Sequence, residues 1–534
     1  MFGVFMKTRF KLSAAALLVA LATGAWAQGA KFAISSYQVE GNTLLPADRV
    51  EQILSTYLGA ERSLDDVNAA AEALRQAYED AGYPVIKVFP PQQTAAAGRV
   101  TLKVIEGEVQ SVKIKGNEAY DETNIRSSLP PLQEKTKPNA KQIVAAIAAA
   151  NENPAKQVAV NFQSAEEVGQ IDAIVNVTED RPQKFMAGYD NMGSTSTGVN
   201  RINLGYQNAN LFNRDHMATV QYATSLDYPS KSQQISAGYR VPLYDYGLSL
   251  DVIGAYSHSK ANTSVGFGGS TQITGEGYML GLRVNQSMPS AGEYRHRMIY
   301  GFDFKDFNNT CTGAAAGTCG TVTALPVSAT YFGAFNAPEV QASAALSFAI
   351  NVPGGPHGGK QEYALARAGA EPDWNAWRAN TNVLVPLPAD LQIRGALNGQ
   401  LSLDRLVPGE QFGLGGSSSV RGYVERTVSG DTGYSGNLEV YSPDFGKLMS
   451  SNVNARALLF YDFGRVYATD ANKFGEKQLP LSSVGAGLRF NLGRDLAIKF
   501  DVGFAQEKHI AAPGTAATRQ VGDGYGHAAI NLQF

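Results

Sequence analysis

Apolar and polar residues alternate along most of this 534-residue chain after Pro182. Segments of about ten residues carry the alternation, and loops rich in Gly, Ser, Thr and Asn separate them, which predicts β-strands. In the segment LAIKFDVGF, Leu496 and Phe500 fall on one face, whereas Lys499 and Asp501 fall on the other. Sixteen strands are predicted in this way, at 184–191, 201–210, 216–225, 232–242, 247–258, 275–288, 294–307, 328–337, 340–352, 373–387, 391–404, 435–443, 453–467, 482–492, 495–506 and 526–534.

Two architectures fit such an alternation. A transmembrane β-barrel turns its apolar face to lipid and its polar face to a wet interior, whereas a soluble β-sandwich turns its apolar face inward. An even number of segments and the lack of a break into smaller domains favour one barrel over 182–534, although the pattern leaves the strand boundaries in 308–372 open. The chain ends in YGHAAINLQF, with Ile530, Leu532 and the last residue, Phe534, on one face. Such an ending is typical of strands that a barrel-assembly machinery inserts into a membrane.

The N-terminus predicts a secretory signal peptide over 1–27. Three basic residues precede the apolar stretch LSAAALLVALATGAWA, which ends in small residues at Ala25 and Ala27. A membrane anchor needs about 20 apolar residues, and this run is shorter. The whole chain has 45 basic and 48 acidic residues, a balance that gives no reason to expect a nucleic-acid partner.

The sequence offers no site for a metal or for catalysis. Only two cysteines occur, Cys311 and Cys319, and in a secreted chain they most simply close one small disulfide loop. The six histidines are scattered, so no metal-ligand cluster is expected. Motifs of nucleotide hydrolases, zinc proteases and serine hydrolases do not occur. We therefore expect neither a cofactor, nor a metal, nor a catalytic residue, and no enzymatic activity.

The region before the predicted barrel repeats one plan twice. The sequence VEGN at 39–42 is echoed by IKGN at 114–117. Each echo ends a short strand and is followed by residues at helical spacing, and then by two more strands. Two similar α+β modules are therefore predicted, at 31–108 and 109–181.

One arginine stands out because it lies among glycines and serines. Arg421 belongs to the stretch EQFGLGGSSSVRGYV, in the connection between the eleventh and twelfth predicted strands. That connection, at about 405–435, is too long for a tight turn, so it must either hang outside the barrel or fold into it.

An aspartate on the next predicted strand offers a partner for this arginine. In NVNARALLFYDFGRVY, period-two counting puts Asp462 on the polar, lumen-facing side together with Phe460 and Gly464. Gly464 has no side chain and leaves room for an approaching group. If the 405–435 loop folds inward, Arg421 is expected to meet Asp462 in a bidentate ion pair.

The arginine loop resembles the signature of TpsB-type transporters, the ShlB/FhaC/HecB-like outer-membrane partners of two-partner secretion. In the superfamily to which they belong, the sixth extracellular loop folds into the barrel, and its tip pairs with the aspartate of an F-x-x-D-x-G strand motif. The resemblance places that aspartate at Asp462, with Gly464 in place and Leu459 where the motif has Phe. It places the loop tip at Val420, Arg421, Gly422 and Tyr423.

Further stretches extend the resemblance over nearly the whole mature chain. Each repeat resembles a POTRA domain, NENPAKQVAVNF at 151–162 is similar to the second POTRA of this family, and 188–216 and 436–443 resemble barrel segments. The implied fold is an all-β 16-stranded transmembrane barrel in the bacterial outer membrane, after two periplasmic α+β POTRA domains. Some members plug the pore with an N-terminal helix. The few residues between Gln28 and the first strand give no reason to expect one here.

The resemblance implies secretion of an unfolded, adhesin- or haemolysin-like TpsA exoprotein to the cell surface. The POTRA domains would recognise it, and polar lumen residues such as Arg394, Arg489 and Lys499 would offer it only weak contacts. The other implied partners are the barrel-assembly machinery and outer-membrane lipid. Two alternatives remain: an insertase of barrel-assembly or translocation-assembly type, which usually has more POTRA domains, and a passive porin, which would not need residues 30–180. The sequence leaves open the identity of the exoprotein and whether the loop leaves the lumen.

Overall fold

The computed structural model describes most of the chain beyond the predicted signal peptide. Both the predicted signal peptide and the predicted pair Cys311 and Cys319 lie outside the described residues. The described residues are 31–534 without 94–97, 168, 194–196, 266–270, 309–319, 449, 451, 470–477 and 510–517.

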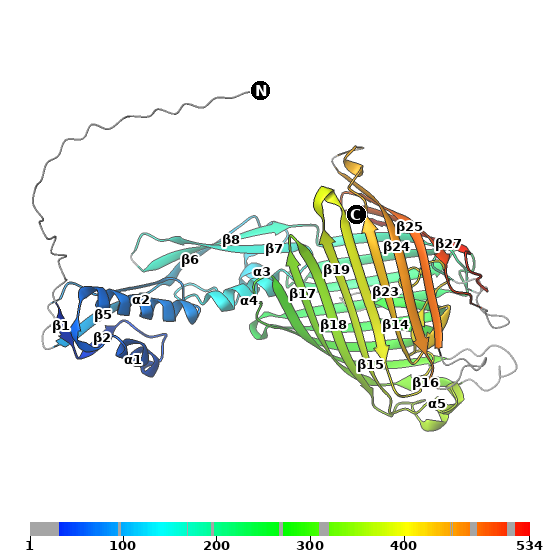
Figure 1. The fold of residues 1–534 in the computed structure, drawn as a ribbon, viewed down its shortest axis with the longest axis horizontal. Helices are drawn as coiled ribbons and strands as arrows, with labels where there is room; N and C mark the ends of the chain where they lie inside the picture. The colour runs from blue at the N-terminus through cyan, green and yellow to red at the C-terminus, as the bar shows by residue number, and fades with distance from the viewer. Residues whose placement is uncertain are drawn as a thin grey trace, which may run out of the picture. The chain divides into compact units, whose positions relative to one another are not determined.

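The C-terminal part of the described chain is a closed antiparallel barrel in which strands follow one another in sequence order and the last pairs with the first (Figure 1). Two of its strands, β16 and β17, pair with β15 in one continuous register on either side of Leu325, so they share one position. The barrel thus has sixteen strand positions among the described residues, which confirms the predicted fold. The strands are β9 (Gln183–Asp190), β10 (Arg201–Leu211), β11 (His216–Ser225), β12 (Gln233–Leu243), β13 (Leu248–Val265), β14 (Thr271–Ser287), β15 (Tyr294–Asn308), β16 (Thr321–Ala324), β17 (Pro326–Ala337), β18 (Val340–Asn351), β19 (Asn375–Pro386), β20 (Gln392–Leu401), β23 (Thr432–Tyr441), β24 (Val453–Tyr467), β25 (Gln478–Leu492), β26 (Leu496–Ala505) and β27 (Gly524–Gln533).

The apolar face of these strands is the exposed one. On β24, Leu459 and Tyr461 are 68% and 45% exposed, whereas the residues that alternate with them, Phe460 and Asp462, are 5% and 0% exposed. A soluble sandwich would show the opposite assignment, because it buries its apolar face. The alternation therefore belongs to a barrel with a lipid-facing exterior and a polar lumen.

The structure adds detail where the alternation was weakest. The connection after β18 contains a short helix, α5 (Lys360–Ala366), which the sequence pattern did not predict. Strand β13 runs several residues past its predicted end at 258, and β14 begins several residues before its predicted start at 275, so this hairpin is longer than one membrane crossing requires. Among the described helices, none is long and apolar enough to span a membrane.

The first repeat forms a compact unit up to Gly107. Its sheet has the order β2-β5-β4, with β2 parallel to β5 and β4 antiparallel to it. The side chain of Ser63 caps α2 in a reciprocal capping box with Asp66, and Leu74 and Tyr78 of that helix are fully buried. The elements are β1 (Phe32–Ile34), β2 (Ser36–Glu40), α1 (Ala47–Ser55), β3 (Gly59–Arg62), α2 (Leu64–Asp80), β4 (Ile86–Phe89) and β5 (Arg99–Glu106).

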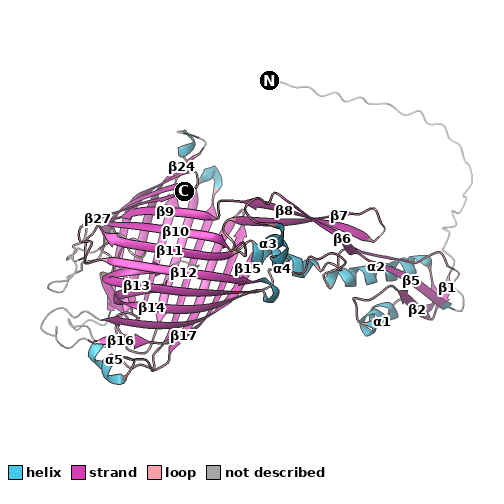
Figure 2. Ribbon diagram, turned by 180° about the vertical axis from the view of Figure 1, so that it is seen from behind, coloured by secondary structure: helices cyan, strands magenta, loops and turns pink. Residues whose placement is uncertain are grey.

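The second repeat has the same sheet plan in the order β6-β8-β7, and its first strand begins at Glu108, one residue before the predicted boundary. Its helices α3 and α4 lie at one end of the barrel (Figure 2). Only three residues separate β8 from the first barrel strand. The elements are β6 (Glu108–Lys115), α3 (Glu122–Ser127), α4 (Ala140–Ala150), β7 (Lys156–Ser164) and β8 (Gln170–Glu179).

The echoed sequences VEGN and IKGN build the same turn in both repeats. Gly41 and Gly116 have φ values of +86° and +84°. A Cβ atom on Gly41 would lie 2.3 Å from the carbonyl oxygen of Val104, and one on Gly116 would lie 2.4 Å from the carbonyl oxygen of Val177. Glycine is needed twice for the same reason, a left-handed backbone pressed against a neighbouring strand.

Candidate functional site

The long connection between β20 and β23 lies inside the barrel. It forms a small hairpin of β21 (Phe412–Leu414) and β22 (Val428–Gly430), and it enters from the end opposite the second repeat. Its apolar side chains Leu414, Val420 and Tyr423 are fully buried. They pack against the inner wall of the barrel, on Val466, Leu481 and Ala505.

The structure brings Arg421 and Asp462 together inside the lumen. The guanidinium donates from Nε to Oδ2 and from Nη2 to Oδ1, both at 2.7 Å, and the backbone N–H of Arg421 donates to Oδ2 at 3.0 Å. Asn437 of β23 adds a fourth donor to the carboxylate, at 2.8 Å from Oδ1. Asp462 is 0% exposed. The loop tip is therefore held by a bidentate, charge-assisted contact that water does not reach.

Arg421 also contacts residues that the sequence analysis did not single out. Its Nη1 lies 2.8 Å from Oε1 of Glu439 and 3.5 Å from Oδ1 of Asp501. Its guanidinium carbon lies 3.5 Å from the ring centroid of Phe460, a cation–π contact. One arginine thus faces three carboxylates and an aromatic ring on three different strands.

Two further arginines balance this acidic cluster. Arg394 lies 3.0 Å from Glu439, and Arg489 lies 2.8 Å from Asp501. Together with Arg421, three guanidinium groups meet three carboxylates. The pairing matters because a buried charge without a partner is costly. Alternation could have placed Glu439 and Asp501 on the lumen face, but it could not show that they meet one arginine.

Glycines allow the loop tip to approach the wall closely. Gly422 has a φ of +90°. A Cβ on Gly503 would lie 2.6 Å from the backbone nitrogen of Gly422 and 2.7 Å from the carbonyl carbon of Arg421. A Cβ on Gly464 would lie 2.5 Å from a methyl group of Leu414. Gly464 therefore makes room for the loop hairpin, while Gly503 makes room for the tip itself.

Tyr423, the last residue of the tip motif, is bonded to β25 and to the connection that follows β26. Its hydroxyl lies 2.8 Å from the carbonyl oxygen of Glu507 and 3.1 Å from that of Ser482. The backbone N–H of Glu507 donates to the same hydroxyl at 3.2 Å. All four residues of the tip motif are buried.

A second set of ion pairs holds the two ends of the loop. Near the first end, Glu410 accepts from Lys305 at 2.8 Å and from Arg378 at 2.9 Å. At the other end, the buried carboxylate of Asp431 accepts two hydrogen bonds from the guanidinium of Arg367. Arg367 directly follows α5, so a second loop of the barrel latches the inward loop. The sequence analysis missed this latch because the alternation breaks down in that region.

The remaining lumen forms a polar cavity of about 1440 Å³. The three basic residues that alternation placed in the lumen, Arg394, Arg489 and Lys499, all line it. Arg283 lies there too, paired with Asp303 at 2.7 Å. Nine Lys or Arg side chains but only four Asp or Glu side chains line the cavity, so basic residues are in excess. Seven of the nine basic side chains nevertheless form an ion pair.

The C-terminal Phe534 lies at the closure of the barrel. Its backbone exchanges hydrogen bonds with Phe185 at the start of β9, at 2.9 and 3.0 Å. The two rings stack with centroids 5.9 Å apart. The described residues contain no group of three or more His, Cys, Asp or Glu side chains that could hold a metal ion.

This fold and loop define a class of protein, outer-membrane barrels with an inward-folded loop. The model of the family "Haemolysin secretion/activation protein ShlB/FhaC/HecB" matches residues 169–490, and the chain belongs to this family. The model of the ShlB-type POTRA domain matches residues 32–107. The predicted family is thereby confirmed.

Curated relatives and solved structures agree with this assignment. The chain is 24% identical to the outer membrane transporter CdiB of Dickeya dadantii (strain 3937), over 76% of this chain and 71% of that one. It is 22% identical to the heme/hemopexin transporter protein HuxB of Haemophilus influenzae (strain ATCC 51907 / DSM 11121 / KW20 / Rd), over 90% and 85%. The solved structure of CdiB from Escherichia coli has the same fold, with a TM-score of 0.73 at 18% identity, covering 96% of this chain and 92% of that one.

The family membership confirms the predicted function and location. The chain is an outer-membrane transporter of two-partner secretion, with a POTRA domain before its barrel. It is a transporter and not an enzyme. Members of this family secrete TpsA exoproteins.

Proposed function

We propose that this chain captures its own exoprotein, unfolded, on the second repeat and passes it as an extended chain through the barrel lumen. In this proposal residues 31–108 and 109–181 are two POTRA domains. The shared sheet order of the two repeats and their shared glycine turn support the assignment.

Capture would take place at the free edge of a sheet. In the described part of the second repeat, β7 is one of the two outer strands of its sheet, and residues 161–164 of that strand are exposed. An extended segment that adds to such an edge gains main-chain hydrogen bonds and needs little sequence specificity. The exposed Phe162 offers one apolar contact on the same edge.

Passage would take place through the polar cavity beside the inward loop. The observation that carries the proposal is the charge-paired lumen, in which the arginines that line the wall face carboxylates. A moving chain meets many weak polar contacts there and no broad apolar trap. In this proposal Arg421 and Asp462 anchor the loop that shapes the pore.

The direct test is removal of the gene in its native host. The secreted protein encoded beside it is then assayed in the growth medium and in the periplasm. We expect loss from the medium, with recovery when the wild-type gene is returned on a plasmid. Unchanged export without the gene would refute the proposal.

A further inference from the structure

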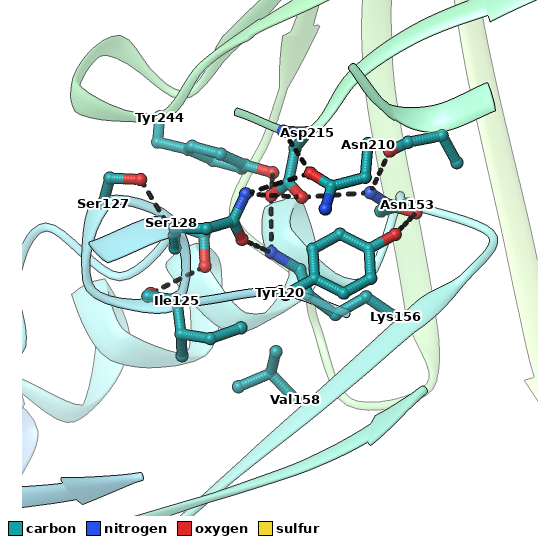
Figure 3. A network of polar contacts seen from close by, with 12 residues as sticks. Tyr120, Ile125, Ser127, Ser128, Asn153, Lys156, Val158, Asn210, Asp215 and Tyr244 are labelled. Carbon is teal, nitrogen blue, oxygen red and sulfur yellow. Dashed lines mark hydrogen bonds and ion pairs between the residues drawn. The ribbon is translucent and has the colours of Figure 1, made fainter. Parts of the chain in front are cut away.

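The second repeat and the barrel share a fully buried ion pair. Lys156 lies at the first position of β7, and Asp215 lies in the turn between β10 and β11. Their side chains are 0% and 1% exposed, and the ammonium group of Lys156 donates to Oδ2 of Asp215. The same ammonium donates to Oδ1 of Asn124 at 2.9 Å and lies 5.1 Å from the ring centroid of Tyr120 (Figure 3).

Donors from both parts of the chain converge on the carboxylate of Asp215 (Figure 3). From the second repeat, Asn124 and Asn153 each donate to Oδ1 at 3.1 Å. From the barrel, the hydroxyl of Tyr244 donates to Oδ2 at 2.6 Å. Burial lowers the pKa of Lys156, and the charge of Asp215 opposes that shift. Lys156, Asp215 and the three side chains that bond to them form one buried network of hydrogen bonds. Loss of any member would leave a buried polar group of another member without its partner.

The turn that carries Asp215 is held in an unusual conformation. Phe212, Asn213 and Asp215 have φ values of 58°, 53° and 59°, in the left-handed region that residues other than glycine rarely adopt. Asn210 at the end of β10 donates to the carbonyl oxygen of Ala119 in the second repeat, at 3.0 Å. A backbone in this region persists only where surrounding contacts hold it in place, and here the second repeat supplies such contacts.

Two more attachments join the same parts. The three residues between β8 and β9 connect them covalently. Glu152, after α4, accepts from Ser287 of β14 at 2.9 Å and lies 4.0 Å from both Arg240 and Arg297. Three separate points of attachment leave little freedom for rotation of the second repeat.

We propose that Lys156 and Asp215 form a clamp that sets the direction in which β7 leads into the barrel. Lys156 is then a positioning residue, and the second repeat and the barrel move as one rigid piece. An apolar contact of similar area would let the second repeat slide against the barrel. A buried ion pair whose hydrogen bonds are all made is satisfied in one arrangement of its partners. The consequence for transport rests on the function proposed above, because the clamp would aim the edge that captures the exoprotein.

The test measures orientation in the full-length protein without using secretion. Spin labels are placed at Gln163 on the exposed end of β7 and at Leu448, which is 89% exposed between β23 and β24. Cys311 and Cys319 are replaced by Ser in every variant. Double electron–electron resonance then gives the distribution of label distances in detergent and in vesicles.

We expect one narrow distribution for the parent protein and a broad one for Lys156→Gln. The matched control is Lys113→Gln, because Lys113 forms an ion pair with Asp172 at 2.7 Å within the second repeat but is 55% exposed. It should leave the distribution narrow. If Lys156→Gln does not insert, Tyr244→Phe removes one hydrogen bond to Asp215 and should broaden the distribution to a smaller extent.

A narrow, unshifted distribution in the inserted Lys156→Gln or Tyr244→Phe variant would overturn the clamp. Secretion of the neighbouring gene product is measured on the same variants. A broad distribution with normal secretion would keep the clamp and refute its role in transport. Loss of secretion upon gene deletion tests the proposed function separately.

Discussion

At the scale of single residues, the loop tip depends on Asp462 more than on its other acidic contacts. Asp462 accepts three hydrogen bonds from Arg421. Glu439 and Asp501 each contact only the Nη1 atom of Arg421, and each also has an ion pair with a second arginine. Removal of one partner from a buried ion pair leaves a charge without compensation, at a cost of about 3–5 kcal/mol.

The first prediction is that Asp462→Asn releases the loop tip. Conductance through single pores in planar bilayers should rise and fluctuate, and secretion should fall. Glu439→Gln should have a weaker effect, since Arg421 keeps its bidentate partner. Exchange of the two residues, Arg421→Asp with Asp462→Arg, should not restore the parent conductance, because the new aspartate would face Glu439 and Asp501. Equal conductance in all variants would contradict the role of the pair.

The second prediction concerns the close approach of the loop tip to β26. In Gly503→Ala, the new methyl group would meet the backbone of Gly422, which cannot move aside as a side chain can. We expect the tip to shift and the conductance to rise. Gly395→Ala is the control, because a methyl group there meets nothing within 4 Å. If both variants conduct like the parent, the tip is not packed as described.

At the scale of elements, two loops of the barrel close on each other. The inward loop is held at its tip by β24 and at its far end by Arg367, which follows α5. Asp431 also accepts from the backbone N–H groups of Leu406 and Thr469, both at 2.9 Å. The latch therefore links three connections at the cell-surface end of the barrel.

The third prediction is that Arg367→Gln loosens this latch. Asp431 would keep its backbone donors but lose its only described ion-pair partner, so cleavage of the loops by externally added trypsin should increase. Lys360→Gln in the same loop is the control, because its ion pair with Glu371 is exposed on both sides. Equal cleavage of the two variants would show that the latch has no separate effect.

At the scale of the whole molecule, the chain divides after Gly107 into two compact units. The first has its own apolar core, which includes Leu74, Tyr78 and Leu102. The second joins the second repeat to the barrel through the clamp and the short β8–β9 connection. Separate cores allow one unit to fold without the other.

The fourth prediction is that deletion of 31–107 leaves an inserted barrel. Its mobility on gels should still change upon heating, as expected for a folded barrel, while secretion should fall. Deletion of 31–181 should weaken the barrel further, because Asp215 would lose the ammonium group of Lys156 and the amides of Asn124 and Asn153. Equal heat stability of the two deletions would contradict this dependence.

The sequence by itself determined which face of each strand meets lipid. A period of two suffices to assign Tyr461 to the lipid face and Asp462 to the lumen face. The echoed sequences around Gly41 and Gly116 likewise revealed the repeat. Both features depend only on residues that are near one another in the chain. The tip motif even indicated one partner of Arg421.

Only the tertiary structure decided the other partners. Lys156 and Asp215 are 59 residues apart, and Arg367 and Asp431 are 64 apart. Whether such residues meet depends on strand register, barrel closure and the path of loops without periodicity. Local patterns contain none of this information, so the clamp and the latch became visible only when the strands were placed around a closed barrel.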